Sequence, residues 1–110
     1  MNEIIAEREI FAVSHEGKKK IFHIVLERPH RSEAGDWVCL SKIEGLYATN
    51  LAGIRGIDSW QALGLAMGFV HQLLLGYLED GGKLYWEEDG EEISLSDLFP
   101  QLTKVNCGIK

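Results

Sequence analysis

The chain has 110 residues, of which 45% are hydrophobic and 25% charged, and these proportions are typical of one soluble globular domain. Its formal net charge of −6 argues against nucleic-acid binding as the main function, because such binding needs a concentrated cationic surface. Glu3, Glu7 and Glu9 interrupt the start of the chain, where a secretory signal would be basic and then apolar. We therefore expect a single cytoplasmic domain over residues 1–110.

The first half of the chain predicts four β-strands. Alternating apolar and polar residues on either side of Gly17 predict a hairpin with strands at about residues 4–14 and 19–28. A loop after Pro29 leads to two runs of period two, which predict strands at about 36–44 and 46–54. The small basic group "RPHR" lies in that loop, where we expect its side chains to be solvated.

A long helix is predicted over about residues 58–80. Asp58 is a good N-cap, because its carboxylate can accept from the free amides of the first turn, and Gln61 completes a capping-box pattern. Gly81 and Gly82 follow the last apolar residue, where helices commonly end in a left-handed residue.

This predicted helix carries no Asp, Glu, Lys or Arg from Ser59 to Leu78, a run about as long as a bilayer requires. Its glycine and polar interruptions, its acidic ends and the lack of flanking Lys or Arg clusters favour a soluble domain without a membrane span. Apolar residues nevertheless cover well over half of its circumference. We therefore expect either a sheet that curls around the helix or a second subunit that covers part of it.

One narrow stripe of the helix is polar and contains glycines: Gly64, Gly68, His71 and Gln72 share it, at roughly 100° per residue. A glycine inside a helix costs about 1 kcal/mol relative to alanine, so we expect a compensating contact. Three contacts fit the stripe. They are a strand or loop of the same chain, the helix of a second copy, or a small-molecule ligand that uses His71 and Gln72 as polar contacts.

After the helix, strands are predicted at about 83–88 and 91–95, joined by Asp89-Gly90 in a type I′ turn. This register places Trp86 across from Ile93 and puts like charges directly opposite one another at the tip of the hairpin. The tip is either a solvated edge that discourages aggregation or a docking site for a basic protein partner. Its acidic residues are Glu87, Glu88, Asp89, Glu91 and Glu92.

The residue types that carry catalysis or bind metals are scattered. No histidine stands at zinc-ligand spacing from another histidine or a cysteine, and Ser59 lacks the glycine-flanked turn of a reactive serine. Cys39 and Cys107 fit two free thiols in a reducing cytoplasm. We predict no catalytic residue, metal or cofactor, and the balance is against an enzyme. The four histidines are His15, His23, His30 and His71.

The run "GIDSWQALGLAMGFV" followed by "GGKLYW" resembles a family of small uncharacterised bacterial proteins, a domain of unknown function. The likeness covers roughly Arg8 to Phe99. It implies a bacterial cytosolic α+β domain and transfers no catalytic residue, and the acidic "EEDGEE" segment looks particular to this chain. The matching positions are Gly56, Ile57, Asp58, Ser59, Trp60, Gln61, Ala62, Leu63, Gly82, Leu84 and Trp86.

Together these patterns predict an α+β domain in two layers: a curved, mainly antiparallel sheet of about five or six strands, packed on one long central helix. A short C-terminal helical turn, capped by Ser94 or Ser96, is expected to follow. The leading functional interpretation is a self-associating cytosolic interaction protein whose acidic surface suits neutralisation of a basic protein. The alternative is a small-molecule-binding protein or small enzyme with a pocket between the Gly64, Gly68 and His71 stripe and the sheet.

Overall fold

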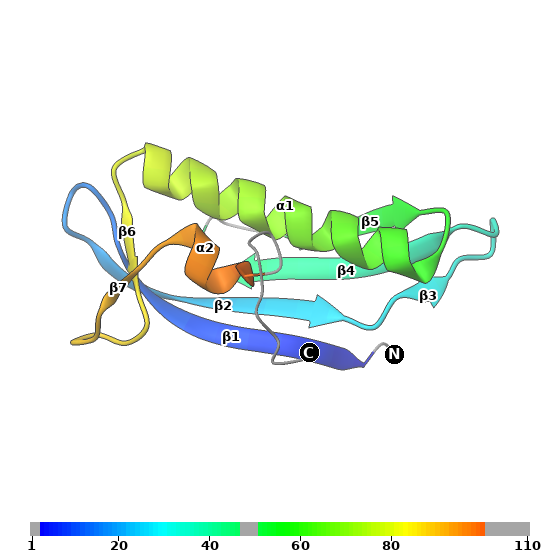
Figure 1. Cartoon of the computed structure of the whole chain (residues 1–110), viewed down its shortest axis with the longest axis horizontal. Coiled ribbons are helices and arrows are strands. Elements are labelled where there is room, and N and C mark those ends of the chain that lie inside the picture. Colours follow the sequence, from blue (N-terminus) through cyan, green and yellow to red (C-terminus); the bar gives the residue numbers. More distant parts are fainter. Residues whose placement is uncertain (1–2, 47–50, 101–110) are drawn as a thin grey trace, which may run out of the picture.

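The computed structural model describes residues 3–46 and 51–100 and confirms the α+β, two-layer architecture. One long helix, α1 (Ser59–Glu79), lies on one face of an antiparallel sheet, and a short helix, α2 (Leu95–Leu98), lies beside it (Figure 1). Within the described ranges the sheet has seven strands. They are β1 (Ile4–Val13), β2 (Lys19–Glu27), β3 (His30–Arg31), β4 (Trp37–Glu44), β5 (Leu51–Gly56), β6 (Lys83–Tyr85) and β7 (Glu92–Ile93).

The strands follow the predicted hairpins with one addition. β4 pairs with β5 along one side and with β2 and β3 along the other, while β1 joins β2 to β6 and β7. The loop expected after Pro29 instead forms β3, because His30 and Arg31 pair with Val38 and Trp37 and so continue the edge begun by β2. The predicted fourth strand overlaps β5, and residues 47–50 of that prediction lie outside the described residues.

Local capping defines α1, as the sequence predicts. The Asp58 carboxylate accepts from the amide of Gln61 at 2.8 Å, and the Gln61 side-chain oxygen accepts from the amide of Ile57 at 2.8 Å. At the other end Gly81 has a φ of +96°, and the amide of Gly82 donates to the Tyr77 carbonyl at 3.0 Å. These are the hydrogen bonds of a Schellman motif, which satisfies the last carbonyls of the helix.

The fully buried residues of α1 form a single line of small and branched side chains. Ala62, Ala66, Val70 and Leu74 are buried at four-residue intervals, and they face β4 and β5. Of the two kinds of cover expected for the apolar circumference of α1, the sheet supplies only part within the described residues, because Trp60 and Leu65 on other sides of α1 remain exposed. One face of α1 is therefore covered and another is open.

The hairpin after α1 has a different register from the predicted one. Leu84, not Trp86, pairs with Ile93, and the amide of Gly90 donates to the Glu87 carbonyl at 3.0 Å. Gly90 does not have a positive φ, so the turn is not type I′. In the observed turn, residues 87–90, Glu88 no longer lies across from Glu91, nor Glu87 across from Glu92. This lessens the repulsion between carboxylates that the predicted register would have opposed.

The predicted C-terminal helical turn is confirmed as α2, with Ser94 as its N-cap. The Ser94 amide donates to the Asp97 carboxylate at 2.9 Å, which fixes the first turn. α2 brings Phe99 against α1, where its side chain is buried. This placement makes Phe99 part of the surface next to the glycine stripe.

Candidate functional site

The open face of α1 carries an uncharged groove of about 650 Å³, which we call the α1 groove. A Cβ atom built on Gly64 or Gly68 would meet no described residue within 4 Å. At one end the Trp60 side chain is 87% exposed. All four predicted stripe residues line the groove, whose full lining is Trp60, Leu63, Gly64, Met67, Gly68, His71, Gln72 and Phe99.

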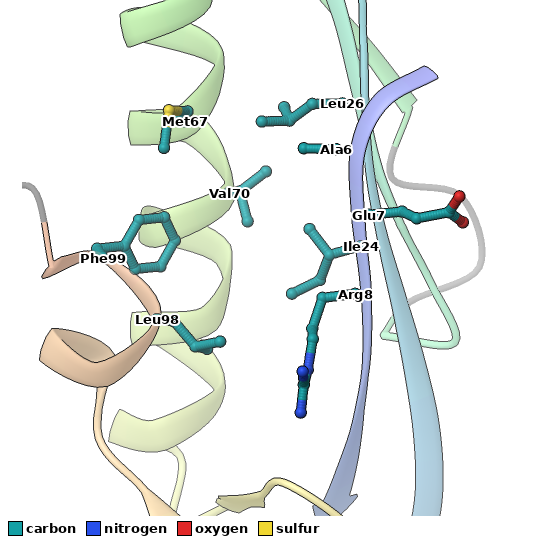
Figure 2. Close-up of a pocket in the computed structure, with 9 residues that line it drawn as sticks. All are labelled: Ala6, Glu7, Arg8, Ile24, Leu26, Met67, Val70, Leu98 and Phe99. Carbon is teal, nitrogen blue, oxygen red and sulfur yellow. The ribbon is translucent and has the colours of Figure 1, made fainter.

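The α1 groove lies on a different side of the helix from the sheet, which corrects two predictions. Ala62 makes the close approach to the strands, and Gly64 follows it by about 200° around the helix. The glycines therefore do not serve packing against any described strand or loop. The predicted pocket between the Gly64, Gly68 and His71 stripe and the sheet is wrong for the same reason. A cavity between α1 and the sheet exists, but no stripe residue lines it (Figure 2).

His71 forms one lip of the α1 groove together with Phe99. The two rings are 5.0 Å apart and meet edge to face at 74°, so the imidazole is half-buried rather than freely solvated. Gln72, the next residue, is exposed. The groove thus combines an apolar floor with two polar groups at its margin.

The acidic tip is separate from the α1 groove. Its five acidic side chains are all exposed, and they surround the β6–β7 turn at one end of the molecule (Figure 1). The N-terminal end of α1, where the groove begins, lies at the opposite end beside β5. The structure therefore presents the two predicted surfaces independently.

A cluster on the helix-free face of the sheet was not predicted. His23 on β2 bridges two strands, because its Nε2 lies 2.7 Å from a Glu7 oxygen and its Nδ1 lies 2.9 Å from a Glu44 oxygen. The hydrogen bonds to Glu7 and then Glu44 raise the pKa of His23 above 6.5. The His23 bond, followed by the charge of Lys42, lowers the pKa of Glu44. Alternation along β2 shows which face His23 occupies, but only the pairing of three strands reveals the cluster.

The described residues hold no obvious reaction centre. Within 3–46 and 51–100, no group of three or more His, Cys, Asp or Glu side chains could hold a metal ion. Cys39 is buried, its thiol donates to the Glu27 carbonyl at 3.3 Å, and burial raises its pKa, so it is a poor nucleophile. Cys107 lies outside the described residues.

By length and composition α1 could also cross a membrane, and it is the one helix of the described segments that could. Only 22% of its apolar stretch is buried inside the protein. Core helices of soluble proteins pass the same test, so this finding is weak support for a span. It does show that much apolar helix surface is left without cover by described residues.

Comparison with known proteins supports only a family assignment. The model of a family described as "Domain of unknown function (DUF6968)" matches residues 6–96. No match was found among curated proteins or among solved structures.

Proposed function

The chain belongs to the DUF6968 family of domains of unknown function, and from its surface we propose that it is a cytoplasmic interaction protein that self-associates through the α1 groove. One observation carries the proposal: an uncharged helix face with an exposed tryptophan and two open glycines has no cover from the described residues. In a two-fold dimer the same surface of each copy meets the other. Such a contact would bury Trp60 of both copies.

Electrostatics favours this face over others. Each copy has a net charge of −6, so two copies repel each other overall. The stretch from Ser59 to Leu78 contributes no formal charge. Interface centres are depleted in charged residues and enriched in aromatic ones, and the α1 groove has both properties.

The glycines set how closely two helices can approach. Helix axes at a contact are about 8–10 Å apart, and small residues at the crossing allow the short end of this range. Gly64 and Gly68 leave room for a ridge of side chains from the partner helix, such as one formed by Trp60 or Met67. A long side chain in place of Gly68 would occupy the space that the partner helix needs.

The test replaces Gly68 with glutamine and uses Gly76 for the matched control. Gly76 is on the same helix and equally open, but it does not line the α1 groove. We expect the wild type and Gly76→Gln to sediment at about twice the monomer mass of 12.4 kDa, and Gly68→Gln to sediment at the monomer mass.

Both substitutions improve helix propensity, because glutamine is a better helix former than glycine. Loss of the dimer in Gly68→Gln alone therefore cannot be ascribed to unfolding, and far-ultraviolet circular dichroism provides the check. A monomeric wild type at high micromolar concentration, or equal association of all three proteins, would refute self-association through this groove.

A second candidate function is capture of a basic protein by the acidic tip. Its five carboxylates are exposed, and none forms an ion pair with another described residue. Charge of one sign on a projecting turn accelerates encounter with an oppositely charged partner. The same tip also suits a solvated edge strand, which needs no partner.

To separate these readings, Glu87, Glu88 and Glu91 are changed together to glutamine. The control changes three other exposed acids, Glu3, Glu16 and Glu33, and so matches the charge lost. If the tip docks a partner, one identified basic protein from the source cell is retained by the wild type and the control and released by the tip variant. Equal retention by all three would leave the tip as a solvated edge.

A further inference from the structure

A second concavity lies between α1, α2 and the β1–β2 hairpin, and Met67 and Phe99 separate it from the α1 groove, which they also line. It has a volume of about 160 Å³. Figure 2 shows Leu26 and Ile24 directed into it from the sheet and Val70 from α1, while the Glu7 carboxylate points to the other side of β1. The side chains that enclose it are otherwise apolar, apart from Arg8; they are Ala6, Ile24, Leu26, Met67, Val70, Leu98 and Phe99.

Arg8 is the single cation at this cavity. Its side chain leaves β1 on the cavity side of the sheet (Figure 2). The guanidinium carbon lies 4.7 Å from the ring centroid of Trp86, a cation–π contact that holds the group in place. Among the described residues no carboxylate pairs with Arg8. Arg8 is exposed, so its planar N–H donors are available to a ligand.

An apolar recess with one cation at its margin suits an amphiphilic anion. A closed apolar cavity of about 150 Å³ holds a molecule the size of benzene, so this recess has room for a hydrocarbon body of that size. Arginine presents paired donors that match a carboxylate in two parallel hydrogen bonds. We propose that this cavity binds a small apolar monocarboxylate, with the hydrocarbon body against Ile24, Leu26 and Val70 and the carboxylate on Arg8.

The surrounding charge favours a monoanion over a phosphate. Glu7, Glu9 and Glu87 border a neighbouring depression that also contains Arg8 and Trp86. One guanidinium compensates one negative charge, whereas a dianion would leave a second charge close to these carboxylates. The ligand class is therefore a carboxylate with a body of benzene size.

The test titrates the full chain with benzoate, hexanoate, benzamide and phenyl phosphate and follows backbone amide shifts by NMR. We expect both carboxylates to shift amides of residues 6, 24, 26 and 70 at millimolar concentration or below, and to bind at least about tenfold more tightly than benzamide or phenyl phosphate. No binding of either carboxylate up to about 10 mM would overturn the proposal. Tighter binding of phenyl phosphate than of benzoate would overturn it as well.

Two variants locate the site. Arg8→Gln should weaken benzoate about tenfold or more and leave benzamide unchanged, because it removes only the charged hydrogen bonds. Its control, Arg28→Gln, loses the same charge at an exposed arginine outside the cavity and should bind benzoate like the wild type. Equal benzoate affinity in Arg8→Gln and the wild type would refute the role of Arg8.

Ala6→Phe fills the cavity from β1 and should abolish binding of both benzoate and benzamide. Ala6 is exposed and phenylalanine suits a strand, so the fold should persist, and amide spectra report it directly. Undiminished benzoate binding by a folded Ala6→Phe protein would place the ligand elsewhere. Gly68→Gln, which lies in the α1 groove and not in this cavity, should bind benzoate normally even as a monomer.

Discussion

His23 ties three strands together through two hydrogen bonds to carboxylates. Glu7 lies on β1, His23 on β2 and Glu44 on β4, so one imidazole ring connects three adjacent strands. Lys42, 3.5 Å from Glu44, adds a positive charge to the cluster. Because both carboxylates favour the protonated ring, the pKa of His23 rises in the folded protein.

This pKa shift predicts how stability depends on pH. A folded-state pKa above the unfolded value of about 6.5 means that the contribution of His23 is fully present below pH 6.5. That contribution is lost as pH rises through the higher pKa of the folded state. Urea unfolding at a series of pH values should therefore show the wild type losing its stability advantage over His23→Gln between slightly acidic and alkaline pH. Parallel pH profiles for the two proteins would contradict this role.

The sequence predicts the face that His23 occupies but not its partners. Because side chains alternate along a strand, His23 points to the face of the sheet away from its buried neighbour Phe22. Contact between His23 and Glu44 depends on the pairing of β2 with β4. These two strands are separated in the sequence by β3 and a loop. Local pattern carries no information on that register, so the cluster appears only in the folded chain.

At the scale of the element, α1 shows which features sequence determines. Its caps depend on residues within five positions of each end, so Asp58 and Gly81 are found where predicted. Which side meets the sheet could not be predicted, because apolar residues cover most of the helix. The small side chains Ala62 and Ala66 decide it by allowing the closest approach to the strands. In the β6–β7 hairpin, Asp89-Gly90 does not form the two-residue type I′ turn that this pair usually favours, and a turn over residues 87–90 forms instead.

The glycines around α1 should respond oppositely to alanine. Gly76→Ala adds a methyl group into open space and removes a flexible residue from the helix, so the free energy of unfolding should rise by about 0.5–1 kcal/mol. At Gly56 the new Cβ would lie 2.6 Å from the backbone nitrogen of Ala62, and the strand–helix junction would have to shift. Gly56→Ala should therefore lower the free energy of unfolding by about 1–3 kcal/mol. Urea denaturation that moves both variants in the same direction would contradict this assignment.

At the scale of the whole molecule, an acidic protein with an uncharged open face should associate more strongly as salt increases. Each copy carries a net charge of −6 while the α1 groove has no formal charge, so screening weakens repulsion and leaves the apolar contact intact. Sedimentation equilibrium from about 0.05 M to about 0.5 M NaCl should show a falling dissociation constant. A rising constant would instead indicate association through charged surfaces, such as the acidic tip of one copy with Arg28 and Arg31 of another.

The central claim is that two copies meet through the α1 groove, and isotope-filtered NMR tests it most directly. In a mixture of ¹³C-labelled and unlabelled chains, we predict NOEs between copies that involve Trp60, Met67 and Gly68. Intermolecular NOEs confined to the edge strands or the acidic tip would contradict this claim. A protein of dimer mass that shows no intermolecular NOE at Trp60, Met67 or Gly68 would contradict it as well.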